Sequence, residues 1–253
     1  MPYTITLPIS AAAHHPHPHL HRVLHANLYA WFAAADSALA DDLHHQPVRK
    51  PFTLSPLTRH DGTIHVLRVA LLDDALWEPF RAGLAARPFV DLQGDTIPLA
   101  LADLEMCHRS YAELLEGAST GTRIALRFLT PTCFRAGDLD SPLPEPRSMV
   151  RSWLSRWSQY APAPLRINVA LVDVAIVHVA VSGYNLHTRV TDMGYGKQMG
   201  FVGRVTLRVV KARKLGEEIL RQLNALADYA EFCGTGRKTT HGMGQTRRIR
   251  RER

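Results

Sequence analysis

The segment from Phe232 to Gln245 combines residue types that could hold an anion. It reads FCGTGRKTTHGMGQ, so four glycines fall within eleven residues and two cations lie between the glycine pairs. Glycine lacks a Cβ and adopts positive φ readily, so such a backbone can turn N–H groups onto a bound anion. A surface turn before a last strand is the plainer alternative. We predict a phosphate-facing loop with these members: Gly234, Gly236, Arg237, Lys238, Gly242 and Gly244.

This loop does not match the P-loop of nucleotide hydrolases. A P-loop follows a strand and closes with Gly-Lys-Ser/Thr, whereas Gly236 is followed by Arg237 and the preceding segment has a helical pattern. Nucleotide hydrolysis is therefore disfavoured, and a polyanion such as RNA or DNA remains as the ligand.

Histidines near the N-terminus raise a second possibility, a metal site. His17, His19 and His21 alternate, and His21 and His25 are four residues apart, which are spacings that can bring imidazoles to one ion. Prolines interrupt the run, however, and acidic or cysteine ligands are missing. We favour a solvated loop leading into a helix, and we predict neither a metal nor another cofactor.

Composition points to an ordinary folded domain. A chain of 253 residues can bury a substantial core, as one large domain or two small ones. No apolar run approaches the roughly 18–20 residues of a membrane span, and no signal-peptide pattern opens the sequence. Cys107, Cys133 and Cys233 are odd in number and lack metal-ligand spacing. We therefore predict a cytoplasmic protein that makes no use of a membrane.

The positive charge is concentrated in the C-terminal part. The net charge is +7, but residues 189–253 alone hold 15 Lys and Arg against 6 Asp and Glu, a balance of +9. The remaining residues therefore sum to −2. A basic half of this kind indicates an acidic partner bound through phosphates, with an affinity that depends on salt.

The elements that must position these residues form two similar halves. In the first half the pattern predicts strands at Tyr3–Pro8, Phe52–Pro56 and Ile64–Leu72, a helix from Asp73 to about Ala86, and extended segments at Thr96–Ala102 and Glu105–Tyr111. An apolar stripe from Leu24 to Leu43 predicts helix, and Asp36-Ser37 offers an N-cap that divides it into two helices near Ala35. The order is that of a ferredoxin-like unit.

The second half repeats the pattern. We predict strands at Thr122–Leu129 and Phe201–Val210, helices at Met149–Tyr160 and Leu215–Phe232, and a linker-like run at Ser141–Pro146. The apolar run Val169–Val181 fits a helical start and a strand at its end, and a final basic strand or tail follows the glycine loop. The fold class is therefore α+β, with tandem ferredoxin-like (RRM-like) domains and antiparallel sheets, at residues 1–115 and 120–253.

Three parts of the chain resemble the sequence landmarks of a known family. The strand Phe201-Val-Gly-Arg-Val-Thr206, the helix after it and the glycine loop resemble the C-terminal signature of CRISPR-associated endoribonucleases that cut repeat RNA into guides. The segments Arg123–Pro131 and Leu43–Ser55 are similar to further landmarks of that family. The resemblance implies cleavage of the precursor transcript without a metal: a ribose 2′-hydroxyl attacks the adjacent phosphate and leaves a 2′,3′-cyclic phosphate and a 5′-hydroxyl.

The resemblance also implies a site composed of Tyr29, His44 and Lys50. An imidazole can take or give a proton at neutral pH, Lys50 can stabilise charge on the phosphoryl oxygens, and Tyr29 can orient the attacking hydroxyl. Fifteen residues of unbroken helix would hold Tyr29 and His44 about 22 Å apart, so this hypothesis requires the break at Asp36. His45 is an alternative to His44, and Lys50 could instead be a phosphate anchor.

The expected partner is CRISPR repeat RNA in the precursor transcript, and Arg247 joins the glycine loop among the predicted RNA-binding residues. The rival from another class is a guide-RNA-binding subunit of a surveillance complex that does not cut. A DNA-binding regulator is disfavoured because no helix-turn-helix is recognisable. Association with other effector subunits and formation of a homodimer stay open.

Overall fold

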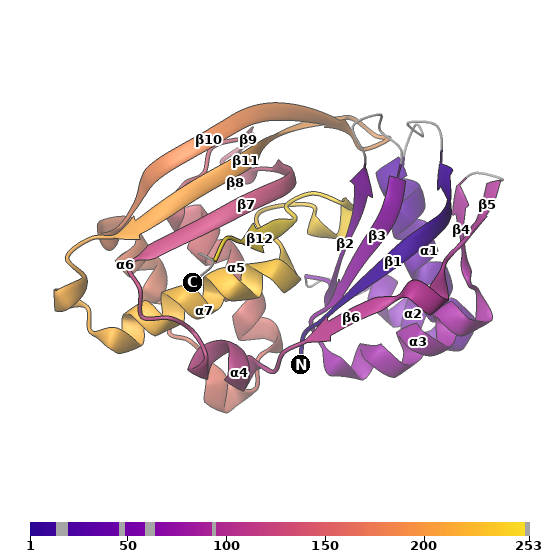
Figure 1. Ribbon diagram of the computed structural model, residues 1–253, viewed down its shortest axis with the longest axis horizontal. Helices are drawn as coiled ribbons and strands as arrows, with labels where there is room; N and C mark the ends of the chain where they lie inside the picture. Colours follow the sequence, from indigo (N-terminus) through magenta and orange to yellow (C-terminus); the bar gives the residue numbers. More distant parts are fainter. Residues whose placement is uncertain (14–19, 46–48, 59–63, 93–94, 251–253) are drawn as a thin grey trace. The chain divides into compact units, whose positions relative to one another are not determined.

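The computed structural model describes residues 1–13, 20–45, 49–58, 64–92 and 95–250 (Figure 1). The chain divides into two compact units. The first comprises Met1–His108 with two short segments, Asp192–Gln198 and Thr240–Gly242. The second comprises the remaining segments, Arg109–Thr191, Met199–Thr239 and Met243–Arg253. Within the described ranges no helix has the length and apolar character needed to cross a membrane.

The first unit is ferredoxin-like. Its four-stranded sheet has the order β2-β3-β1-β6, and each pair of neighbours is antiparallel. The elements are β1 (Tyr3–Ala13), α1 (Leu20–Ala35), α2 (Ser37–His45), β2 (Phe52–Thr58), β3 (Ile64–Leu71), α3 (Trp77–Ala86), β4 (Phe89–Leu92), β5 (Asp95–Pro98) and β6 (Glu105–His108). The order of the main elements agrees with the predicted strand–helix–strand–strand–helix–strand pattern.

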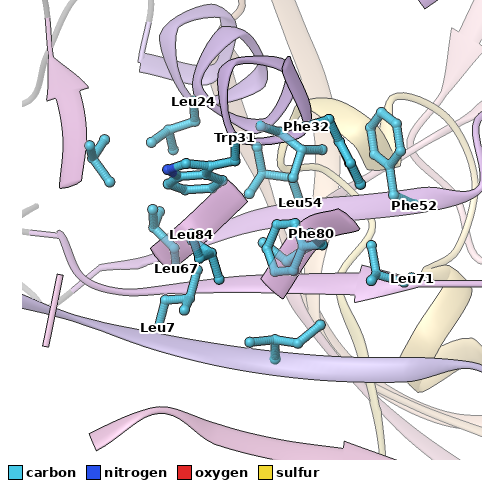
Figure 2. Close-up of a cluster of buried hydrophobic side chains, with 14 of the residues drawn as sticks. Leu7, Leu24, Trp31, Phe32, Phe52, Leu54, Leu67, Leu71, Phe80 and Leu84 are labelled. Atoms are coloured by element: carbon cyan, nitrogen blue, oxygen red, sulfur yellow. The ribbon is translucent and has the colours of Figure 1, made fainter. Parts of the chain in front are cut away.

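The core of this unit lies between the sheet and the helices α1 and α3. Figure 2 shows Trp31 and Phe32 of α1 and Phe80 of α3 above side chains of the strands, and all three are fully buried. The alternating residues Ile5 and Leu7 of β1 are fully buried as well. Burial of such side chains contributes about 1.5–3 kcal/mol each, so this layer is the main source of the unit's stability.

The predicted break between two helices is present. Helix α1 ends at Ala35 and α2 begins at Ser37. Asp36 caps α2, since its carboxylate accepts a hydrogen bond of 3.0 Å from the backbone N–H of Leu39. The cap lets the chain change direction at one residue, so the two helices contact each other instead of continuing as one rod.

Two expectations for the end of this half were wrong. Thr96–Ala102 is not one extended segment, because β5 ends at Pro98 and a 3-10 turn follows at Leu101–Asp103; β5 pairs with the unpredicted strand β4. Glu105–Tyr111 is strand only as far as His108, and Tyr111 begins helix α4 (Tyr111–Glu116). Ser110 and Glu113 form a capping box there. This motif starts a helix at Tyr111, although the alternation of the preceding residues favours a strand.

The second unit also places helices against a four-stranded sheet, in the order β10-β11-β7-β12 (Figure 1). Beyond α4 its elements are β7 (Arg123–Thr132), β8 (Phe134–Ala136), β9 (Leu139–Ser141), α5 (Pro146–Tyr160), α6 (Leu171–His178), β10 (Val179–Asp192), β11 (Lys197–Val209), α7 (Glu217–Cys233) and β12 (Thr246–Arg248). As predicted, the run Val169–Val181 starts as a helix and ends as a strand. The expected linker at Ser141–Pro146 is shorter, because β9 includes Ser141 and Pro146 already opens α5.

Aromatic side chains form the centre of this unit. Tyr111 of α4, Trp157 of α5 and Tyr229 of α7 meet with ring centroids 5.0 to 5.5 Å apart, and the two tyrosine hydroxyls share a hydrogen bond of 3.1 Å. The bond satisfies two polar atoms that are buried in the core. The helices α4, α5 and α7 are thereby joined on one side of the sheet.

Candidate active site

Three aromatic rings that can take part in proton transfer meet in the first unit. The phenol ring of Tyr29 lies edge-on to the imidazole of His44, with centroids 5.1 Å apart, and edge-on to the imidazole of His25, with centroids 5.0 Å apart. The structure therefore brings the predicted pair Tyr29 and His44 together. It adds His25, which the sequence reasoning considered only as a metal ligand.

Local structure explains this grouping. His25 and Tyr29 are one helical turn apart on α1, so their side chains share a face. Tyr29 packs against the buried ring of Phe52 at 5.7 Å, which supports it from the strand side. The break at Asp36 folds α2 back along α1, and His44 in the last turn of α2 thereby reaches Tyr29.

Lys50 fixes the end of α2. Its Nζ donates hydrogen bonds to the carbonyl oxygens of Leu43, at 2.6 Å, and His44, at 2.8 Å. The last carbonyls of a helix lack partners within the helix and carry the negative end of its dipole, so an ammonium group is favoured there. Burial lowers the pKa of Lys50 from its usual value. The lysine thus places a positive charge beside the backbone of His44.

His25 has a defined tautomer. Its Nδ1 lies 3.0 Å from the carbonyl oxygen of Thr240, which can only accept, so Nδ1 carries the proton and Nε2 carries the lone pair. Burial lowers the pKa of His25, and the nearby His44 and Lys50 act in the same direction, against the hydrogen bond to Thr240. A neutral imidazole with a basic Nε2 is suited to accept a proton. The spacing of His25 and Tyr29 on one helix was the sequence signal that could have found it.

Tyr29 is held in its protonated form. Burial raises the pKa of its phenol to about 12, and its hydroxyl lies 3.5 Å from the carbonyl oxygen of Leu43. At neutral pH this group can donate a hydrogen bond but does not serve as a base.

His45 differs from His44 in its contacts. Both imidazoles are exposed, but Nδ1 of His45 bonds the carbonyl oxygen of Asp41 at 2.8 Å and so turns back onto its own helix. The ring of His45 contacts that of His44 at 5.2 Å, whereas the ring of His44 contacts Tyr29. Of the two imidazoles, it is therefore His44 that belongs to the group of rings around Tyr29.

The predicted histidine run lies only partly in the described chain. His17 and His19 fall outside the described residues. His21 packs its ring against Gly242, and His25 bonds Thr240 as above. Among the residues that the structure describes, no three His, Cys, Asp or Glu side chains gather as a metal site would require.

The glycine loop has the backbone that its sequence suggests. Gly234, Gly236, Gly242 and Gly244 all have positive φ, between 66° and 89°. The backbone N–H groups of three of them, however, face inward: that of Gly234 donates to the carbonyl of Ala230, that of Gly236 to the Ser152 hydroxyl, and that of Gly244 to the carbonyl of Pro131. A Cβ at Gly236 or Gly244 would lie 2.3 or 2.1 Å from a carbonyl oxygen. The glycines at these positions thus permit tight folding of the loop.

Helix α5 anchors this loop within the second unit. The buried guanidinium of Arg156 donates to the carbonyl oxygen of Gly236 at 3.3 Å and to the hydroxyl of Thr239 at 2.9 Å. The indole of Trp153 donates to the hydroxyl of Thr235 at 2.8 Å. Arg156 is therefore a buried supporting residue of the loop that the sequence reasoning missed; its spacing from Trp153 on one helix is too common to have marked it.

The predicted cations near the loop differ in their surroundings. Arg237 is partly buried and forms an ion pair with Asp140 of β9. Lys238 is also partly buried and holds the left-handed backbone conformation, with φ of 55°. Arg247 is exposed on β12, where it lies opposite Arg127 of β7.

Fold and site together define a class: tandem ferredoxin-like proteins in which imidazoles gather around a phenol, with an ammonium group beside them. Comparison with known proteins agrees. The model of the CRISPR-associated endoribonuclease Cas6 family matches residues 126–246. A Cas6 product complex is 30% identical with a TM-score of 0.84, covering 98% of this chain and 100% of that one. Curated proteins compared by sequence give no match.

Further solved structures agree with this assignment. Thermus thermophilus Cas6 is 30% identical with a TM-score of 0.75, covering 98% of each chain. A second Cas6 product complex is 25% identical with a TM-score of 0.77, covering 99% of this chain and 100% of that one. The chain therefore belongs to the CRISPR-associated endoribonuclease Cas6 family.

Proposed function

We propose that this protein cuts CRISPR repeat RNA in the precursor transcript to release guide RNAs, and that the cut needs no metal ion. The observation that carries the proposal is the contact of two imidazoles, His25 and His44, with one phenol, Tyr29. The similarity to Cas6 product complexes supports an RNA substrate.

The proposed reaction is a transesterification. The ribose 2′-oxygen forms a bond to the adjacent phosphorus, the bond from phosphorus to the 5′-oxygen breaks, and the products are a 2′,3′-cyclic phosphate and a 5′-hydroxyl. One proton must leave the 2′-hydroxyl and one must reach the 5′-oxygen. Two imidazoles can divide these tasks, each contributing about 10²–10⁴ in rate.

The roles follow from the surroundings of each residue. His25 is the better proton acceptor, since its Nδ1 is held by Thr240 and its lowered pKa keeps it neutral. His44, exposed at the end of α2, delivers the proton to the leaving oxygen. Tyr29 donates a hydrogen bond from a phenol that stays protonated, and Lys50 stabilises charge on the phosphoryl oxygens while it holds the end of α2.

RNA binding is assigned to the basic second half. Lys238 and Arg247 supply positive charge to the RNA backbone, and the four glycines shape the loop that carries Lys238. Arg237 shares its charge with Asp140, so we expect a smaller contribution from it.

The test incubates the purified protein with repeat RNA from the CRISPR array of its own genome, in EDTA, and identifies the product ends. We expect a cyclic phosphate and a 5′-hydroxyl, no cut in RNA with a 2′-deoxy residue at the scissile nucleotide, and loss of cleavage but not of binding in His44→Ala. His45→Ala is the matched control and should cut normally. Tight binding without any cut would instead identify a guide-RNA-binding subunit, and cleavage that stops in EDTA would exclude the metal-free reaction.

A further inference from the structure

One face of the sheet in the second unit carries five exposed arginines, here called the arginine face. They are Arg123 and Arg127 of β7, Arg204 and Arg208 of β11, and Arg247 of β12. Their placement follows from the strand register. Arg127 lies directly opposite Arg204 on one side and Arg247 on the other, and Arg123 lies opposite Arg208. Directly paired residues share a face of the sheet, and so do residues four apart on one strand.

The other face of the same strands belongs to the core. Leu126 and Phe128 of β7 and Val205 and Leu207 of β11 alternate with the arginines and are buried. Arg248 follows Arg247 and takes the opposite side of β12, where its guanidinium lies 3.5 Å from the carboxylate of Asp228 on α7. The sheet therefore pairs its inward arginine with an acid. Of the ion pairs formed between described residues, none includes a member of the arginine face.

Such an arrangement has an electrostatic cost. Like charges directly opposite each other on neighbouring strands are destabilising, and the three strands of the row Arg204–Arg127–Arg247 are only about 4.8 Å apart. The second row, Arg208–Arg123, lies four residues further along, or about 13 Å away. Charges spread over these distances match a chain of phosphates better than a single small anion.

The residues between the two rows indicate how a nucleic acid would be held. They are Thr206 of β11 and Ala125 of β7, which are directly paired. RNA-reading sheets of this general shape stack bases on aromatic side chains, and these positions carry none. Between the two rows, the surface can therefore contact the sugar–phosphate backbone but offers no platform for bases.

We propose that the arginine face is a second RNA contact, separate from the catalytic residues, which holds the phosphates of an RNA strand without reading its bases. The inference rests on the proposed function in one respect, namely that the substrate is RNA. It assigns RNA binding to Arg123, Arg127, Arg204 and Arg208, which would act together with Arg247.

The test measures the salt dependence of binding to a fluorescent single-stranded polyuridine 20-mer. All proteins carry His44→Ala, and gel electrophoresis verifies that the RNA stays intact. Each phosphate contact in single-stranded RNA contributes about 0.7 to the slope of log affinity against log salt, so loss of three contacts should reduce that slope by about 2. We therefore compare the triple variant Arg127→Gln, Arg204→Gln, Arg247→Gln with its parent between about 50 and 200 mM salt.

Two control proteins distinguish the effect of where the arginines lie from the effect of removing three positive charges. The variant Arg81→Gln, Arg151→Gln, Arg213→Gln removes three exposed arginines elsewhere and should leave the slope unchanged. The variant Arg127→Lys, Arg204→Lys, Arg247→Lys keeps the three charges and should retain most of the slope. If the glutamine variant is destabilised and melts at a lower temperature, the slope of this lysine variant still tests whether the charges at these positions contact RNA.

An unchanged slope in the glutamine variant, or an equal fall in both glutamine variants, would overturn the inference. Loss of binding to a partner protein with RNA binding intact would also overturn it, since the face would then be a protein-docking surface. The proposed function is judged by a different measurement, the cleavage of repeat RNA by the unaltered protein. If the unaltered protein cuts repeat RNA but the glutamine variant keeps the salt slope of its parent, only the inference fails. If the slope falls in the glutamine variant but the unaltered protein does not cut, only the proposed function fails.

Discussion

His25 stacks on His241, with ring centroids 4.0 Å apart and ring planes inclined by 22°. The two residues are separated by more than two hundred positions in the chain, yet both belong to the first unit. The neighbouring carbonyl of Thr240 accepts the Nδ1 proton of His25. The short segment 240–242 of the glycine loop therefore completes the surroundings of the imidazole on α1 and selects its tautomer.

The first prediction concerns the dependence of cleavage on pH. Burial lowers the pKa of His25 below 6.5, so its neutral, proton-accepting form is present above that lowered value. On the acid side, the cleavage rate should thus fall as the pH drops through this lowered pKa. His25→Ala should reduce the rate by about 10²-fold or more and remove this acid limb. Single-turnover rates at each pH provide the measurement, and His45→Ala, which should keep the limb, is the control.

A second prediction concerns Lys50. Lys50→Met removes the charged donor from the carbonyls of Leu43 and His44, which should lower the free energy of unfolding by about 1 kcal/mol and slow cleavage more than it weakens RNA binding. Lys50→Arg keeps a charged donor and should recover most of both losses. Urea denaturation and single-turnover cleavage measure the two effects. If Lys50→Met weakened RNA binding alone, the residue would be a phosphate anchor and not a support of α2.

Asp36 gives a third prediction, because its carboxylate caps α2. Asp36→Ala should cost about 1 kcal/mol of stability and reduce cleavage, since the last turn of α2 presents His44. Asp42→Ala removes an exposed acid from the same helix and serves as the matched control. Equal effects of the two substitutions on cleavage would mean that net charge near the site, and not the cap, is responsible.

These residues also show how far sequence alone could predict the site. The break at Asp36 was predicted from a capping residue inside an apolar stripe. The hypothesis of a shared site required this break, because only a broken helix lets His44 approach Tyr29, and the structure shows the two rings in contact. The tandem ferredoxin-like fold followed from the order of strands and helices. Such signals are local and periodic, so a single sequence contains them.

What could not be predicted depends on contacts between distant segments. The tautomer of His25 is decided by the carbonyl of Thr240, and nothing within one helical turn of His25 indicates that contact. The inward direction of the loop's N–H groups depends in part on the Ser152 hydroxyl of α5. The arginine face depends on register between strands, which the spacing of arginines within any one strand does not reveal.

The last prediction concerns Gly242, where two effects of a side chain can be separated. At this position φ is +89°, and a Cβ would lie 2.4 Å from Nδ1 of His21. At Gly137 φ is also positive, +59°, but a Cβ would meet nothing within 4 Å. Gly137→Ala therefore measures the cost of the backbone conformation alone, about 1–2 kcal/mol.

Gly242→Ala should cost about 1–3 kcal/mol more than that, because His21 or the loop must move. It should also slow cleavage, since His241 is the adjacent residue and stacks on His25, whereas Gly137→Ala should leave the rate unchanged. Thermal denaturation and single-turnover cleavage of the two variants make the comparison. If Gly242→Ala were no more costly than Gly137→Ala and cut RNA normally, the packing of residues 240–242 against α1 would have no part in the reaction. The glycine at 242 would then serve only the turn.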